Sequence, residues 1–100
     1  MTCYKLVRMI ESFRHKGLKR FFGYDDRKKL PPDMVERIRT VLSLLDASTT
    51  LDDLRQPSLR LHALKGDWAG FWAVTVRANW RIVFRYELGK ICDVDLVDYH

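Results

Sequence analysis

The sequence predicts an α+β domain in which N-terminal helices pack on a mostly antiparallel sheet of about four or five strands. Three observations support this class. The chain has 100 residues, which is enough for one hydrophobic core and too few for two. Apolar residues recur at helical spacing before residue 59 and alternate after it. Turn-forming segments separate the alternating runs, as in an antiparallel meander.

Two helices are predicted in the first half, after a short strand-like run at residues 9–13. Leu18, Phe21 and Phe22 recur at helical spacing, and Gly23 is a plausible end. These positions predict a short basic amphipathic helix.

The segment Pro31-Pro32 opens the second predicted helix, because proline loses only a donor that the first turn leaves unpaired. Thr50 and Asp53 predict a capped single turn after this helix. The buried face of the helix, broadened by Val41, is predicted to contain Val35, Ile38, Leu42 and Leu45.

The rest of the chain has strand character. Four runs alternate or are rich in β-branched and aromatic side chains, namely 59–63, 71–76, 80–87 and 91–100. The predicted turns between them fall at Gly66, 77–79 and 87–90. Regular alternation in the last run places Cys92, Val94 and Leu96 on one face with Asp98 and His100.

The formal charge of +5 draws the chain toward polyanions, because binding to phosphates releases condensed counterions. Nucleic acid is therefore the leading partner, and an anionic membrane is the weaker alternative. Basic residues gather in the first third of the chain, where a solvated helix face competes with RNA contact as the explanation. These candidate RNA-binding residues are Lys16, Lys19, Arg20, Arg27, Lys28 and Lys29.

The sequence lacks a membrane-spanning run, a secretory signal and paired cysteines, and these absences guide the expected location and redox chemistry. No apolar run approaches the length of about 20 residues that crosses a bilayer, and the first residues lack the features of a secretory signal. We therefore expect a cytoplasmic protein that has no membrane partner. Cys3 and Cys92 lack the paired spacing of a metal or redox motif, and Cys92 is expected to be a small buried hydrophobe.

Several side chains suit the cutting of RNA without a metal or other cofactor. That reaction needs a base for the 2′-hydroxyl, positive charge near the phosphorane and an acid for the leaving 5′-oxygen. His62 and His100 suit the proton transfers, and Lys65 and Arg81 suit the phosphorane. Arg81 shares a predicted strand face with Arg85, and two arginines on one face can bind phosphate.

Asp98 is available to orient an imidazole, and Tyr99 to stack on a base. Each residue type also has an ordinary explanation, because surface histidines, solvated lysines and fraying ends are common. The spacing of His62 and Lys65 would put them on opposite faces of a regular strand. Either a bulge intervenes or the chain already turns at Leu64.

Five sequence blocks resemble the HigB toxins of the RelE superfamily, in the expected order from Met9 to His100. The blocks are M-I-x-S-F-x-H-K-G-L-K-R-F-F at 9–22, L-R-L-H-x-L-K-G at 59–66, G-x-W-x-V at 70–74, N-W-R-I at 79–82 and D-Y-H at 98–100. Residues 1–8 have no counterpart in that pattern. The resemblance therefore implies a single RelE-like toxin domain at 9–100 and an N-terminal extension at 1–8, which is either a true extension or a misassigned start.

The resemblance implies a ribosome-dependent endoribonuclease that enters the ribosomal A site, cleaves mRNA there and is silenced by a HigA-like helix-turn-helix antitoxin. The family's catalytic set falls on His62, Lys65, Asp98, Tyr99 and His100, with Arg81 as a phosphate ligand. The alternative is a non-catalytic module for nucleic acid or a protein partner on the same fold, including a gyrase-inhibitor-like toxin. Such a module should not need either His62 or His100.

Overall fold

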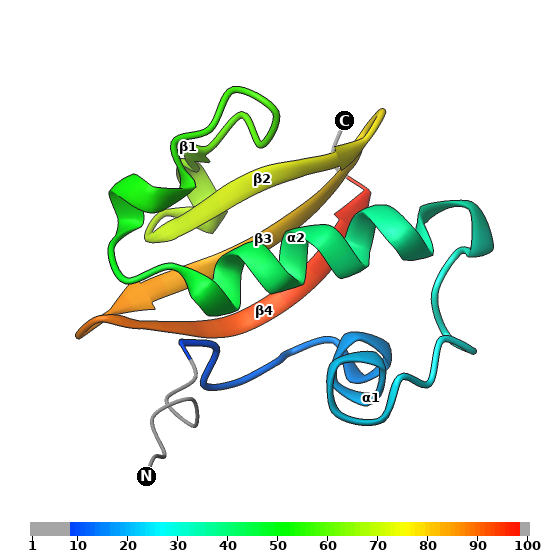
Figure 1. Ribbon diagram of the computed structural model, residues 1–100. Helices are drawn as coiled ribbons and strands as arrows, with labels where there is room; N and C mark the ends of the chain where they lie inside the picture. The colour runs from blue at the N-terminus through cyan, green and yellow to red at the C-terminus, as the bar shows by residue number, and fades with distance from the viewer. Residues whose placement is uncertain (1–8, 99–100) are drawn as a thin grey trace, which may run out of the picture.

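A four-stranded antiparallel sheet with the strand order β1-β2-β3-β4 organises the fold, seen in a computed structural model that describes residues 9–98 (Figure 1). The predicted extension at 1–8 lies outside the described residues, as do Tyr99 and His100. The strands are β1 (His62–Ala63), β2 (Phe71–Arg77), β3 (Trp80–Glu87) and β4 (Lys90–Asp98). Two α-helices precede the sheet in the chain, which confirms the predicted α+β class.

Helix α1 (Lys16–Tyr24) buries Leu18 and Phe21, as predicted. Its first turn is capped by His15, whose Nδ1 accepts a hydrogen bond from the backbone N–H of Leu18 at 3.1 Å. The helix ends at Tyr24, one residue past Gly23, and its C-cap residue Asp25 adopts a left-handed conformation with φ 58°. Left-handed residues are common at this position because their N–H groups satisfy the last helical carbonyls.

Helix α2 (Val35–Ala47) follows a 3₁₀ turn, η2 (Pro32–Met34), so the two prolines start a tight turn and not the helix itself. The predicted stripe is confirmed, since the side chains of Val35, Ile38, Val41, Leu42 and Leu45 are all buried. The single turn after it is η3 (Leu51–Leu54). Within residues 9–98 no helix has the length and apolarity needed to cross a membrane.

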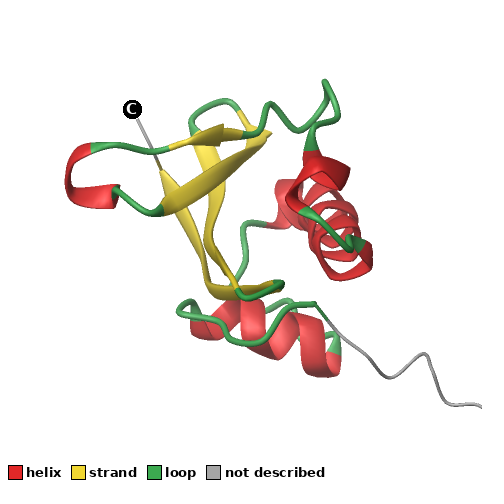
Figure 2. Ribbon diagram, turned by 90° about the vertical axis from the view of Figure 1, so that its left-hand side faces the viewer, coloured by secondary structure: helices red, strands yellow, loops and turns green. Residues whose placement is uncertain are grey.

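Helix α2 lies along one face of the sheet, and α1 lies beyond its β4 edge (Figure 2). The α2 face contributes Val74, Ile82 and Phe84 to the main core, each fully buried. A second, smaller cluster of Leu64, Ala73 and Val83 lies on the opposite face. The sheet is therefore apolar on both faces near its centre, while α2 covers one face only.

The expected strand at 9–13 is instead an extended segment attached to the edge of β4. Ile10 and Phe13 form isolated parallel bridges with Ile91 and Val94. The backbone N–H of Glu11 donates to the Ile91 carbonyl at 2.7 Å, and the N–H of Arg14 donates to the Val94 carbonyl at 2.8 Å. This segment covers the long edge of the sheet, which would otherwise expose unpaired backbone groups.

Two predictions about the strands were wrong, and both errors come from left-handed backbone at residues other than glycine. The run 59–63 forms only the two-residue strand β1, because Arg60 has φ 51° and interrupts the extended chain. In β4, Asp93 has φ 55° and lies where the β3–β4 register shifts. The bulge places Ile91, and not Cys92, on the core face with Val94. Cys92 is half-buried, and burial raises the pKa of its thiol.

Candidate functional site

Three of the predicted catalytic residues lie on or beside the sheet face that α2 leaves uncovered. The register aligns His62 with Ala73, and Ala73 with Val83, whose side chains belong to the smaller apolar cluster. Opposed residues in antiparallel strands project to the same face, so His62 lies on this side of the sheet. Within the described residues this face carries no α-helix (Figure 2).

His62 is exposed, and its ring is held by the backbone. Its Nδ1 lies 3.0 Å from the carbonyl oxygen of Arg60. A carbonyl only accepts, so this contact requires Nδ1 to carry the proton. In the neutral ring Nε2 then has the free lone pair, which is the form that a general base needs.

Lys65 follows β1 at the point where the chain turns. Leu64 is buried under the sheet face, and Lys65 is the N-cap of the 3₁₀ turn η4 (Gly66–Trp68). Gly66 permits this turn with φ 66°. The chain does not turn at Leu64, because the Leu64 N–H still donates to the Phe71 carbonyl at 2.9 Å and Lys65 keeps an extended backbone with φ −128°. The turn begins at Gly66, and Lys65 is exposed just before it.

Arg81 in β3 lies opposite Thr75 of β2 and Val97 of β4, on the same face as His62. Its Nη1 donates to the carbonyl oxygens of Ala78 at 2.6 Å and Trp80 at 3.2 Å. The Nε atom is buried and has no hydrogen-bond partner among the described residues. The charge of a guanidinium beside an open sheet face is suited to a phosphate oxygen.

Arg85, the second arginine of that strand face, is engaged in ion pairs. Its Nε donates to Asp93 at 2.9 Å and its Nη1 donates to Glu87. The hydrogen bond with Asp93 is the main cause of a raised pKa for Arg85. Of the two arginines predicted to bind phosphate, Arg81 therefore has the guanidinium that is less engaged by carboxylates.

Asp98 is exposed and pairs with Trp80, which packs against the main core. Alternation along β4 places it on the α2 side of the sheet, opposite to the face of His62 and Arg81. The structure therefore does not bring Asp98 together with His62. Tyr99 and His100 lie outside the described residues.

One acidic residue near the site was not singled out from the sequence. Asp95 pairs with Val83 and is the diagonal neighbour of Arg81, on the uncovered face. Its carboxylate accepts the N–H of Leu96 at 2.9 Å. The register needed to recognise this neighbour depends on the bulge at Asp93, which the alternation pattern does not reveal.

The candidate RNA-binding residues form a separate basic surface on α1 and the turn after it. All six are exposed, namely Lys16, Lys19, Arg20, Arg27, Lys28 and Lys29. Arg20 forms an ion pair with Asp26 at 2.9 Å. The pKa of Asp26 is lowered, first by the backbone N–H of Lys28 and then by Arg20. We call this set the α1 basic surface.

The α1 basic surface lies at the β4 side of the sheet, whereas His62 and Lys65 lie at the β1 side (Figure 1). The structure therefore separates the two predicted groups by the width of the sheet. One basic residue of the N-terminal segment reaches the uncovered face, because the Arg14 guanidinium lies over the Phe71 ring at 5.6 Å.

Comparison with known proteins gives a consistent family. Residues 11–100 match the family of RelE-like toxins of type II toxin-antitoxin systems described as HigB. The chain is 42% identical over 92 residues to a protein named endoribonuclease HigB from Proteus vulgaris, covering 92% of this chain and all of that protein. It is 31% identical over 80 residues to toxin HigB-1 from Vibrio cholerae, covering 78% of this chain and 84% of that protein.

Proposed function

This chain belongs to the HigB-like family of RelE-like toxins of type II toxin-antitoxin systems, and we propose that it cuts messenger RNA in the ribosomal A site without a metal. Membership of the family implies an antitoxin partner, and we propose that this partner is a HigA-like helix-turn-helix protein. The endoribonuclease activity is inferred from the relative in Proteus vulgaris, which is named endoribonuclease HigB.

The observation that best supports this function is the shared position of His62 and Arg81 on the uncovered sheet face, with Lys65 beside it. His62 lies in β1 and Lys65 follows that strand, while Arg81 lies two strands away in β3, two residues along from Val83 in the row of His62. An RNA backbone lying across these strands would meet a proton acceptor and positive charge in one region of the sheet.

The proposed reaction uses only side chains of the protein and the RNA itself. One histidine accepts the proton of the 2′-hydroxyl, and the 2′-oxygen then bonds to phosphorus. The bond from phosphorus to the 5′-oxygen breaks, and the other histidine, in its protonated form, donates a proton to that oxygen. Lys65 and Arg81 stabilise the extra negative charge of the phosphorane. The products are a 2′,3′-cyclic phosphate and a 5′-hydroxyl.

His62 and His100 share the acid and base roles in this proposal. The geometry of the His62 ring, with Nδ1 toward the Arg60 carbonyl, supports its part. The resemblance of the D-Y-H motif supports His100, with Tyr99 stacking on a base and Asp98 orienting an imidazole.

The proposal is tested by incubating the protein with ribosomes programmed with a defined message and mapping the new RNA ends. We expect cuts within the A-site codon, 5′-hydroxyl ends and little cutting of the same message without ribosomes, because the ribosome holds the substrate in line. A double variant, His62→Ala with His100→Ala, should abolish the cuts, while Arg39→Ala on α2 should retain them. Equal cutting of naked RNA would contradict ribosome dependence. Full cleavage by the double variant would contradict the catalytic roles of the two histidines, and absence of cleavage by the unaltered protein would favour a non-catalytic module.

A further inference from the structure

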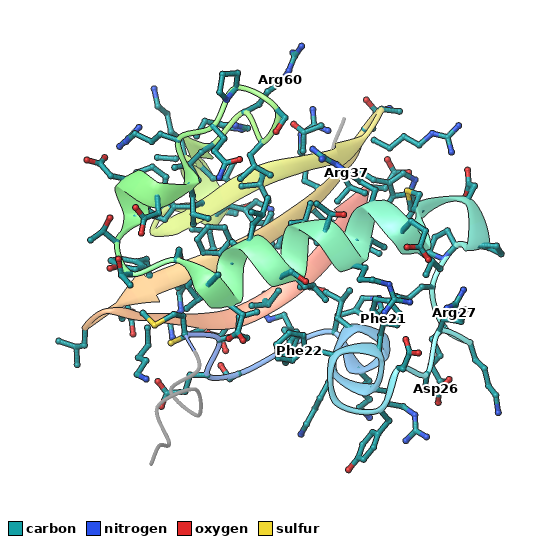
Figure 3. All side chains as sticks on the ribbon, viewed as in Figure 1. Phe21, Phe22, Asp26, Arg27, Arg37 and Arg60 are labelled. Atoms are coloured by element: carbon teal, nitrogen blue, oxygen red, sulfur yellow. The ribbon has the colours of Figure 1, made fainter. Side chains whose placement is uncertain are left out.

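The ring of His62 is held by a backbone carbonyl two residues earlier in the chain. Arg60 precedes β1 and has φ 51°, a left-handed conformation that residues other than glycine seldom adopt. Its carbonyl oxygen lies 3.0 Å from Nδ1 of His62. The side chain of Arg60 points outward from the molecule (Figure 3). The backbone of Arg60 therefore holds the His62 ring, and its side chain takes no part in this contact.

The chain on the N-terminal side of Arg60 is fixed in place. Leu59 is fully buried in the main core. Its carbonyl accepts the backbone N–H of Thr75 at 2.7 Å. Thr75 in turn pairs with Arg81, so one row of the sheet connects this segment to the predicted phosphate ligand.

Arg37 of α2 forms hydrogen bonds with the backbone on both sides of the Leu59–Thr75 contact. It projects from α2 toward β2 (Figure 3). Its Nη2 donates to the carbonyl oxygens of Ser58 at 2.8 Å and Thr75 at 3.2 Å. Its Nε donates to the carbonyl oxygen of Val76 at 3.3 Å. One guanidinium thus holds both the segment before Arg60 and the end of β2, and a fork of donors is the group suited to this.

We propose that Arg37 and the left-handed backbone of Arg60 form a positioning unit that holds His62 with its proton on Nδ1 and its Nε2 toward the RNA. This inference rests on the proposed function for its catalytic consequence. Arg37 and Arg60 are positioning residues, because neither is required to touch the reacting atoms.

The state of the ring is measured directly by ¹⁵N NMR of the full chain labelled at histidine, at a pH where His62 is neutral. The signal of His62 is assigned by its loss in His62→Ala. We expect Nδ1 to carry the proton and Nε2 to be unprotonated. A ring with its proton on Nε2 would overturn the inference.

Two substitutions at Arg60 make a matched pair, because both remove the guanidinium and only one tolerates positive φ. Arg60→Gly accepts the left-handed backbone, so the His62 ring should keep its proton on Nδ1. Arg60→Val disfavours that backbone, so the ring should lose this preference. We expect kcat of Arg60→Val to fall below that of Arg60→Gly by up to about 100-fold, as for a misplaced catalytic group, with KM nearly equal. The same ring state and the same kcat in both variants would contradict the proposal.

Arg37 is tested against Arg39, which lies two residues later on α2 and pairs with Asp25 and Glu36. Arg37→Ala should lower kcat and disturb the His62 ring, whereas Arg39→Ala should do neither. Arg37→Lys retains the charge and should recover part of kcat. If Arg37→Ala does not fold, the Arg60 pair decides the matter. An unchanged His62 ring in folded Arg37→Ala would remove Arg37 from the unit.

The two proposals fail in different ways. If the ring state follows the Arg60 variants while His62→Ala still cleaves normally, the proposed role of His62 in catalysis is wrong and the positioning contact remains. If His62→Ala is inactive while the ring state ignores Arg37 and Arg60, the proposed function stands and the positioning unit does not.

Discussion

The two edges of the sheet are built in opposite ways. The β1 edge has two residues in regular strand, a left-handed residue before them and a 3₁₀ turn after them. The β4 edge is a nine-residue strand with a bulge at Asp93, and it is paired with an extended N-terminal segment. Two candidate catalytic residues, His62 and Lys65, lie at the short edge, and the α1 basic surface lies beside the long one. Substitutions at the short edge should therefore change activity, and those in the segment and the helix that flank the long edge should change stability or ribosome binding.

The largest expected effect tests the short edge. His62→Ala should lower ribosome-dependent cleavage by roughly 100- to 10,000-fold, the range typical of proton-transfer catalysis. The melting temperature should hardly change, because His62 is exposed. Cleavage rate and thermal melting of the same preparation check both points. A large loss of stability would show that the short edge is structural as well.

Arg81→Ala should lower cleavage by about 100-fold, on the scale of losing one transition-state donor. Arg81→Lys keeps the charge but loses the planar fork, so it should recover only part of the rate. Single-turnover cleavage on programmed ribosomes separates this loss from weaker binding. If Arg81→Ala keeps the full rate, Arg81 has no part in phosphate recognition.

The long edge is tested at Asp46, whose Oδ1 accepts the backbone N–H groups of Met9 at 3.0 Å and Ile10 at 3.2 Å. Asp46→Ala leaves both donors without this acceptor and should cost about 1–3 kcal/mol of unfolding free energy. Thermal or urea unfolding measures the loss. Cleavage per folded molecule should stay the same, and a matching loss of cleavage would mean that the two edges are coupled.

Removing charge from the α1 basic surface should weaken ribosome binding without changing the rate of bound enzyme. Each lysine that no longer neutralises a phosphate should reduce the slope of log affinity against log salt by about one. Lys16→Ala and Lys19→Ala test this by titration over a range of salt. Arg77→Ala is the matched control, because Arg77 is paired with Asp33 on another part of the surface. Equal slopes in all variants would reduce the α1 basic surface to a solvated face.

The smallest expected effect is a pH dependence of stability. The pKa of Asp26 is lowered, and that of Asp53 is lowered chiefly by the backbone N–H of Thr49. Because the folded pKa lies below the unfolded value near 3.8, these carboxylates stabilise the fold above that pH and lose the contribution as pH falls through the folded pKa. Asp53 is exposed and Asp26 is only partly covered at the surface, so solvent screening keeps the effect small. Asp26→Asn and Asp53→Asn should flatten unfolding free energy between about pH 2 and 4.

The elements in which apolar residues repeat at a constant helical or strand spacing were predictable from the sequence. Every buried position of α2 carries an apolar residue at helical spacing, and Trp80, Ile82 and Phe84 alternate onto the core side of β3. The α2 stripe and the β3 face could therefore be predicted before the structure was known. Candidate site residues were found for another reason, because few residue types suit proton transfer and phosphate binding near neutral pH.

The rest depended on backbone conformations that composition does not reveal. Arg60 and Asp93 are not residues that signal a left-handed backbone as glycine does, yet they shorten β1 and shift the register of β4. Pairing counted back from the β3–β4 turn would place Arg81 opposite Leu96, whereas the bulge places it opposite Val97. The neighbourhood of Arg81 and Asp95 could not be predicted without that shift.

The attachment of the N-terminal segment to β4 has a consequence for the synthesis of this protein. The N–H of Asp93 donates to Ser12 Oγ across 81 positions of the chain. Contacts of such long sequence separation form late, because a large loop must close first. The N-terminal segment therefore cannot pair with β4 until β4 has left the exit tunnel of the ribosome. A nascent chain cannot complete its native sheet while β4 is still being made, so the ribosome that produces the toxin finishes most of this chain before the folded enzyme exists.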